Sequence, residues 1–123
     1  MKKIKLLLLG CLFALLLIPS CTINEEPSEQ QNNPVSNTKW AAMYKEYTLW
    51  IEFTSNSAFL EFMGDANGNP ASTGVHYGTY SYANGKITFL THDSTSAFDY
   101  ATVNGSMLEL VYKSGSKRTF AKK

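Results

Sequence analysis

The amino-acid sequence predicts an all-β fold, a small antiparallel up-and-down barrel of about eight strands. Its aromatic and β-branched residues come in short runs separated by Asn, Gly and Ser, with no stretch of helical period between end signals. Short turn-forming pairs such as Asn-Gly stand between consecutive runs and are typical of hairpins. A twisted meander of this length removes its exposed edges by closing into a barrel, which favours a barrel over a sandwich.

Residues 1–20 differ from the rest and are interpreted as a bacterial secretory signal. A short basic region, Met1 to Lys5, is followed by an apolar run from Leu6 to Ile18, which is the layout of such signals. A membrane-spanning helix would need roughly 20 apolar residues. Pro19 and Ser20 end the run well before that length.

Cys21 is the expected attachment point of a lipid. The stretch from Ile18 to Cys21 resembles the lipobox of bacterial lipoproteins, with an aliphatic residue three places before the cysteine and a small residue directly before it. The resemblance implies that the Cys21 thiol takes a diacylglycerol, that the chain is cut before it and that the new amino terminus is acylated. Each buried methylene contributes about 0.8 kcal/mol, so several acyl chains hold a protein firmly. We therefore expect an outer-membrane lipoprotein, on the periplasmic side or at the cell surface.

Residues 21–37 are predicted to be a disordered tether. They are rich in Gln, Asn, Ser and Glu, contain two prolines and lack aromatic residues, so they bury too little apolar surface to offset the entropy of ordering. Glu25 and Glu26 are similar to the acidic surface-export signal of Bacteroidetes lipoproteins, although an ordinary polar linker fits them equally well.

Charge and cysteine content exclude several functions. The whole chain has 11 Lys and Arg against 10 Asp and Glu, and loss of Lys2, Lys3 and Lys5 with the signal leaves a net charge of −2. Such a chain has no electrostatic footprint for nucleic acid. Cys11 leaves with the signal and Cys21 is modified, so neither a disulfide nor a cysteine metal site is expected. We also expect no cofactor.

The folded domain is expected over residues 38–123, with a first strand at 38–44. In the hairpin that follows, at 47–54 and 57–63, a two-residue turn at Ser55-Asn56 sets the register. It forms a core face from three apolar pairs: Phe53 with Ala58, Ile51 with Leu60 and Leu49 with Phe62. The outer face then carries two aromatic and two acidic residues: Trp50, Phe59, Glu52 and Glu61.

The clearest local signal is Asn84-Gly85, between strands expected at 74–82 and 86–91. Asn-Gly is the preferred pair for a tight turn with positive φ at both residues. It predicts three cross-strand pairs: Tyr82 with Ile87, Tyr80 with Phe89 and Ser81 with Thr88. The core face is therefore rich in tyrosine.

The third hairpin, at 97–103 and 106–112, allows two registers. A strict two-residue turn at Asn104-Gly105 pairs Ala101 with Leu108 and Asp99 with Leu110, which points a carboxylate inward. A bulged residue instead pairs Thr102 with Leu108, Tyr100 with Leu110 and Phe98 with Tyr112. We favour the bulge, because an unpaired carboxylate among apolar side chains is costly. A strand at 117–121 completes the barrel.

Six stretches of this domain resemble the small lipocalin-like lipoproteins of Bacteroides-type bacteria: Lys39-Trp40, Ile51–Asn56, Gly78–Tyr82, Ile87–Phe89, Ala101–Ser106 and Thr119–Lys123. The resemblance covers nearly the whole folded part. It implies a lipocalin-like barrel that holds a small apolar ligand in its mouth, although no residue matches a ligand-specific motif.

Catalytic and metal-binding residues are not expected. His76 and His92 are the two histidines, and His92-Asp93 with Asp99 would suit an acid/base set or part of a metal site. A lone histidine on each of two strands is more often solvated or hydrogen-bonded, and a nucleophile motif such as Gly-x-Ser-x-Gly is absent from the sequence. We therefore expect a protein that is not an enzyme.

Residues 65–69 have the alternating oxygen ligands of a calcium loop. The glycine, however, comes at the fourth place, and no Glu follows at the twelfth. A polar connection over residues 64–74 is the favoured interpretation, and long loops at a barrel mouth often carry binding.

Two binding functions stay open. Five tyrosines are candidates to line a hollow barrel, or to pack in a closed core with their hydroxyls at the rim: Tyr77, Tyr80, Tyr82, Tyr100 and Tyr112. The sequence thus predicts a membrane-anchored binding module for a small apolar or saccharide-like ligand. Alternatively, Trp50 and Phe59 beside Glu52 and Glu61 form an exposed face for a protein partner or glycan, as in an interaction or inhibitor module.

Overall fold

The computed structural model describes residues 32–95 and 97–123. The predicted signal peptide and Cys21 lie outside these residues. The described part is built from strands: β1 (Thr38–Tyr44), β2 (Tyr47–Phe53), β3 (Ala58–Gly64), β4 (Pro70–Ala83), β5 (Lys86–His92), β6 (Phe98–Asn104), β7 (Met107–Tyr112) and β8 (Lys117–Lys122). Among the residues described, none belongs to a helix long and apolar enough to cross a membrane.

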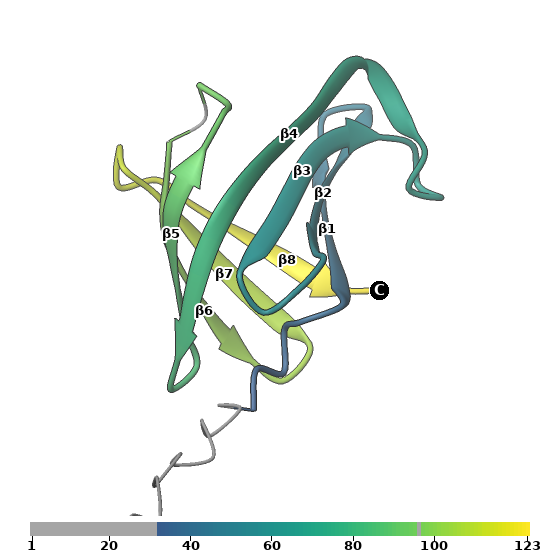
Figure 1. The fold of residues 1–123 in the computed structure, drawn as a ribbon. Helices are drawn as coiled ribbons and strands as arrows, with labels where there is room; N and C mark the ends of the chain where they lie inside the picture. The colour runs from purple at the N-terminus through teal and green to yellow at the C-terminus, as the bar shows by residue number, and fades with distance from the viewer. Residues whose placement is uncertain (1–31, 96) are drawn as a thin grey trace, which may run out of the picture. The chain divides into compact units, whose positions relative to one another are not determined.

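The eight strands form one closed antiparallel barrel in sequence order (Figure 1). Each strand pairs with the next, and β1 closes the ring by pairing Trp40 with Lys122 and Ala41 with Ala121 of β8. The predicted up-and-down barrel is confirmed. Because the barrel is closed, each strand pairs with a neighbour on both sides over at least part of its length.

The Asn84-Gly85 turn sets the predicted register between β4 and β5. Tyr82 pairs with Ile87, Tyr80 with Phe89 and Ser81 with Thr88. Asn84 has φ of 50° and Gly85 of 79°, as a tight turn with two positive φ angles requires. The tyrosine-rich inner face of this hairpin is confirmed, because Tyr80 is buried and Tyr82 packs against the same core.

The predicted register of the β2–β3 hairpin is wrong by one residue. The structure pairs Phe53 with Phe59, Ile51 with Glu61 and Leu49 with Met63. The Ser55 hydroxyl accepts the backbone N–H groups of Ser57 and Ala58 at 3.2 and 3.0 Å, which makes a wider turn than two residues. Since side chains alternate along a strand, the slip turns β3 over and brings Phe59 and Glu61 inside.

The β6–β7 hairpin follows neither predicted register beside its turn. Val103 pairs with Leu108 and Ala101 with Leu110, around a turn at Gly105-Ser106. A bulge does occur, but farther along, between Phe98 and Tyr100. It produces the expected Phe98–Tyr112 pair and leaves Asp99 exposed. Tyr100 therefore pairs with Val111 and not with Leu110.

One end of the barrel, the closed end, is filled by side chains. It carries the β2–β3, β4–β5 and β6–β7 turns (Figure 1). Large side chains that are at most 2% exposed fill it: Trp40, Ile51, Phe53, Phe59, Tyr80, Ile87, Leu108, Leu110 and Phe120. Burial of this size supplies most of the stability of a small β domain without disulfides.

Residues 32–37 cover the closed end, although the sequence assigned them to the tether. The side chain of Val35 is fully buried in the core. Asn33 Nδ2 donates to the Tyr80 hydroxyl at 2.9 Å, and that hydroxyl donates to the Ser55 carbonyl at 2.6 Å. The predicted start of the folded domain at Thr38 is therefore too late, because a single valine finds a place in the core.

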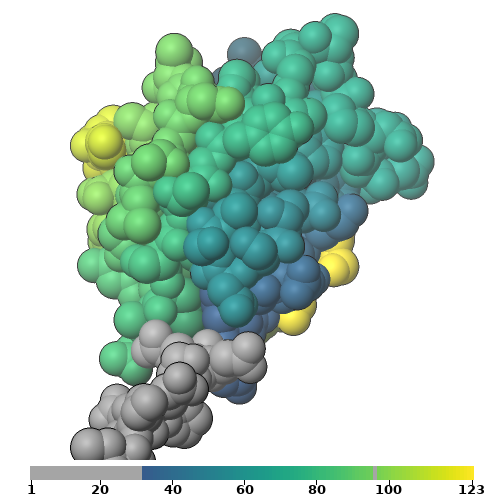
Figure 2. Space-filling model, in the orientation of Figure 1, coloured from purple at the N-terminus to yellow at the C-terminus, as the bar shows by residue number. Residues whose placement is uncertain are grey.

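A second apolar cluster lies on the outside of β1 to β4. It consists of Ala41, Trp50 and Phe62, with Leu60 and Val75 packed against it. The β3–β4 connection projects beside the barrel in Figures 1 and 2. Gly68 of this connection lies against the ring of Trp50. Trp50 Nε1 donates to the Asp65 carbonyl at 3.0 Å, and the Trp50 side chain is only 6% exposed.

Candidate ligand-binding site in the barrel mouth

The other end of the barrel, the mouth, holds a cavity of about 430 Å³. Its lining includes the end of β1 at Tyr44, the first half of β4 at Thr73 and Gly74, and residues of the β5–β6 and β7–β8 connections. Six of its lining residues carry the argument below: Tyr44, Leu49, Glu61, His76, Tyr112 and Arg118. A volume of this size is in the range of small-molecule sites. The barrel is thus filled at its closed end and hollow at its mouth.

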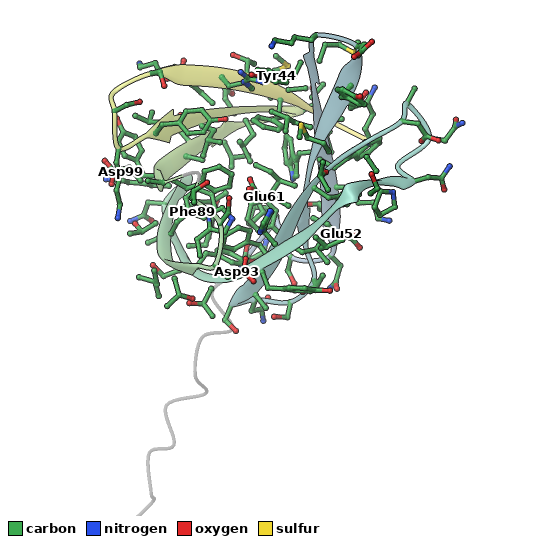
Figure 3. All side chains as sticks on the ribbon, turned by 90° about the horizontal axis from the view of Figure 1, so that it is seen from above. Tyr44, Glu52, Glu61, Phe89, Asp93 and Asp99 are labelled. Atoms are coloured by element: carbon green, nitrogen blue, oxygen red, sulfur yellow. The ribbon has the colours of Figure 1, made fainter. Side chains whose placement is uncertain are left out.

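Strand alternation explains why polar groups gather at this level. On β3, Phe59 is buried in the core, and Glu61, two residues nearer the mouth, shares its face. On β8, Phe120 is buried in the core, and Arg118, two residues nearer the mouth, pairs with the inward Leu110. Figure 3, which looks along the barrel, places Glu61 inside the ring of strands. Apolar residues therefore form the floor of the cavity and polar residues its upper wall.

Glu61 and His92 form a buried pair. Glu61 Oε1 lies 3.4 Å from His92 Nε2, and the side chains are 11% and 8% exposed. Burial raises the pKa of Glu61 from 4.5 to about 7, opposed by a hydrogen bond from Ser94 and by the nearby His76. The His92 ring packs against Phe98, with ring centroids 4.5 Å apart. Near neutral pH, both the protonated and the ionised form of Glu61 are therefore present.

His76 pairs with a different acid, nearer the rim. Its Nδ1 lies 3.4 Å from Asp93 Oδ1, and both side chains are partly exposed. Asp93 Oδ1 also accepts the Tyr77 backbone N–H at 2.8 Å. The set of His92, Asp93 and Asp99 considered from the sequence is therefore not assembled. Within residues 32–95 and 97–123, no three His, Cys, Asp or Glu side chains come together in a way that would hold a metal ion.

Arg118 is the cation of the cavity wall. Its guanidinium carbon lies 4.5 Å from the centre of the Tyr44 ring, a cation–π distance. Its Nη1 is buried and has no hydrogen-bond partner among the described residues. Neighbouring Tyr112 has its pKa raised by burial, lowered by the charge of Arg118 and raised by that of Glu61. Tyr112 therefore lies close enough to Arg118 and Glu61 for their charges to affect its pKa.

Of the five tyrosines predicted as ligand candidates, Tyr112 lines the cavity. Tyr80 and Tyr82 belong to the core, and the Tyr82 hydroxyl accepts the Gly85 N–H at 3.1 Å. Tyr77 is 59% exposed, outside the core. Tyr100 lies on the outer face, where Lys86 Nζ is 4.6 Å from the centre of its ring. Most of the predicted tyrosines therefore serve packing or the surface.

The predicted exposed aromatic face is wrong. Phe59 is 1% exposed inside the barrel, and Trp50 is covered by the β3–β4 connection. Glu61 is also inside. Glu52 alone of these four residues stays on the outer surface, with Oε2 3.3 Å from Lys39 Nζ. The register slip and the folding of the connection over Trp50 cause the difference.

Asp65 holds its own loop together. Its carboxylate accepts the backbone N–H groups of Asn67 and Asn69 at 2.8 and 3.0 Å, and Asn69 Nδ2 at 2.8 Å. These bonds, that from the Asn69 side chain first, lower the pKa of Asp65. The connection predicted over residues 64–74 is shorter in the structure, because β4 begins at Pro70 and residues 65–69 join the two strands.

Sequence reasoning missed Arg118 and Tyr44. A usable signal was present in Lys117-Arg-Thr-Phe120. If Phe120 points into the core, the alternation of a strand places Arg118 on the same face. The same rule extends the inward Trp40 and Ala42 of β1 to Tyr44.

No known protein family, curated protein or solved structure matches this chain.

Proposed function

We propose that this barrel is a binding module that takes a small, polar, saccharide-like molecule into its mouth. The observation that carries the proposal is the cavity of about 430 Å³ between a packed apolar floor and a wall of convergent polar groups. A site of this kind orients a ligand by a few polar contacts and holds it by apolar ones.

The chemistry of the wall favours a saccharide-like ligand over a purely apolar one. The rings of Tyr44 and Tyr112 offer flat apolar surfaces that suit the C–H face of a sugar ring. Glu61, His76 and Arg118 offer hydrogen-bond donors and acceptors that suit its hydroxyl groups. An apolar ligand would leave these polar groups buried without water, which is costly.

The alternative, an interaction or inhibitor module that uses the outer aromatic face, has little support. Its two aromatic residues, Trp50 and Phe59, are both buried.

The binding test needs a variant that blocks the mouth without disturbing the core. Thr73 lines the cavity and is exposed, so Thr73→Trp should fill the entrance. Thr88→Trp is the matched control, because Thr88 is an exposed residue that pairs with the outward Tyr100. A library of mono- and disaccharides and small organic acids would be screened by saturation-transfer NMR.

We expect hits with the wild type and with Thr88→Trp, and loss of those hits with Thr73→Trp. Absence of any hit with the wild type, or hits that persist in Thr73→Trp, would contradict binding in the mouth.

We also propose that the module is anchored to the outer membrane through Cys21, on the lipobox resemblance of residues 18–21. Cys21→Ser should prevent metabolic labelling with a fatty-acid analogue and release the protein from the membrane fraction. Retention of Cys21→Ser in that fraction would mean that residues 6–18 act as an uncleaved anchor.

A further inference from the structure

Three side chains that line the cavity are acidic or basic, and two of them lie beside a group of the opposite type. Glu61 lies 3.4 Å from His92, and His76 lies 3.4 Å from Asp93. Arg118 lines the same cavity and forms no ion pair within the described part of the chain. Among the residues that the structure describes, the permanent positive charge of Arg118 therefore has no ion-pair partner.

The surroundings of Arg118 hold it in place for a ligand. The guanidinium carbon lies 4.5 Å from the centre of the Tyr44 ring. This cation–π contact fixes the position of the guanidinium, but the ring accepts no hydrogen bond from N–H groups in the guanidinium plane. Its buried Nη1 lacks a hydrogen-bond acceptor among the described residues. A buried donor left unpaired is unfavourable, and an acceptor on a ligand would remove that cost.

We propose, on the basis of the binding function above, that the ligand of the mouth carries a carboxylate and that Arg118 binds it. A planar guanidinium matches a carboxylate with two parallel N–H···O bonds. Tyr112 lies beside Arg118 on the cavity wall, and its phenol is protonated at neutral pH and able to donate a further bond.

A carboxylate fits the charge of the site better than a phosphate. Within the described residues, Arg118 is the cation of the cavity without an ion-pair partner. Glu61 lines the wall, and Asp93 lies beside the lining residue His76. A dianion would meet repulsion from these carboxyls with no second cation to offset it. A monoanionic sugar acid satisfies both the Arg118 charge and the hydroxyl-binding groups of the opposite wall.

The same arrangement makes binding of the anion depend on pH. Glu61 faces His92 from β5, His76 from β4, Ser94 and Asp93 from the β5–β6 connection and Tyr112 from β7. Burial raises its pKa, and Ser94, His76 and Asp93 modify it. When Glu61 loses its proton, it adds a negative charge to the cavity. Affinity for a carboxylate should therefore fall as the pH rises through about 7.

Matched pairs of probes test this inference separately from the proposed function. Each pair consists of an acid and its uncharged amide: glucuronate with glucuronamide, galacturonate with galacturonamide, and gluconate with gluconamide. Dissociation constants would be measured by isothermal titration calorimetry at pH 6. The proteins are the wild type, Arg118→Met, Arg118→Lys and Lys117→Met, whose residue lies outside the cavity and pairs with Glu109 at 3.1 Å.

For the wild type and Lys117→Met, we expect the acid of at least one pair to bind about tenfold to 100-fold more tightly than its amide. Arg118→Met should remove this preference, and Arg118→Lys should restore part of it. Circular dichroism melting would establish that each variant is folded. The affinity of the acid, but not of the amide, should decrease from pH 6 to pH 8, and Glu61→Gln should remove most of that decrease.

If the amides bind as tightly as the acids, or if Arg118→Met keeps the preference, the carboxylate inference is overturned while binding in the mouth stands. If no acid and no amide binds and the library screen is also empty, both proposals fail.

Discussion

His92 Nε2 lies 3.4 Å from Glu61 Oε1 inside the barrel, with both side chains at most 11% exposed. A carboxyl group and an imidazole in such a place are tolerated because each is the other's partner and Ser94 adds a bond to Glu61. The pair marks the level at which the packed core ends and the cavity begins. It also gives the fold a titrating group with a pKa of about 7.

The free energy of unfolding should decrease as the pH rises from about 4.5 to 7. Unfolded Glu61 releases its proton near pH 4.5, whereas the folded protein holds it up to about pH 7. The unfolded state therefore binds fewer protons in this range, and its relative free energy falls. Between pH 5 and pH 8, urea unfolding should show a loss of roughly 2 to 3 kcal/mol from this residue. Glu61→Gln should lack this contribution, and an equal pH slope in wild type and variant would contradict it.

Gly78→Ala should destabilise the barrel by about 3 kcal/mol. A Cβ at this position would collide with the Thr91 carbonyl oxygen and with the ring of Phe59. Neither the strand backbone nor a ring in the packed core has room to move. Ser81→Ala, on the outward face of the same strand, is the control and should change the unfolding free energy by less than about 0.5 kcal/mol. Equal midpoints for the two variants in thermal unfolding would show that the close approach is not real.

Trp50→Phe should loosen the β3–β4 connection. The change removes the 3.0 Å bond from Trp50 Nε1 to the Asp65 carbonyl, which is worth about 1 kcal/mol. Amide hydrogen exchange at Gly68, whose N–H bonds to Asp65 at 3.2 Å, should become faster. The Val103 amide, bonded to the Gly85 carbonyl at the closed end, is an internal reference. Unchanged protection at Gly68 would mean that other contacts hold the loop.

Val35→Ala should lower the unfolding free energy by roughly 1 to 2 kcal/mol, because it removes two methyl groups from the core. Val35 is fully buried, whereas the nearby Asn32 is exposed. Asn32→Ala is the matched control and should have little effect. If both variants melt like the wild type, residues 32–37 do not contribute to the fold in solution.

The sequence predicted the barrel, and the physical reason can be seen at Asn84-Gly85. Asn-Gly favours a two-residue turn in which both residues have positive φ, as they do here. Because the turn type sets which residues pair, the register of that hairpin follows directly. Ser55-Asn56 carries no such constraint, and the Ser55 side chain bonds to the backbone to make a wider turn. One residue of difference was enough to exchange the two faces of β3.

The candidate site was harder to predict, because it depends on exceptions to simple burial rules. A two-residue turn at Ser55-Asn56 places Glu61 outside, and only the position of His92 on β5 shows why a carboxyl group is tolerated inside. Arg118 and Tyr44 come from β8 and β1, and their stacking depends on barrel closure. The pairing of consecutive strands, which the sequence predicts, contains no information about a contact between the first and the last strand.

Asn33 bonds to the hydroxyl of Tyr80, and Val35 is buried beside it, so the chain joins the barrel at its closed end. The first described residue, Asn32, therefore lies near the end of the barrel opposite the mouth. A barrel held by its N-terminal side keeps its opening clear of the attachment point. If the proposed anchor holds the protein from this side, a ligand of the proposed site could reach the mouth without the barrel having to detach or turn.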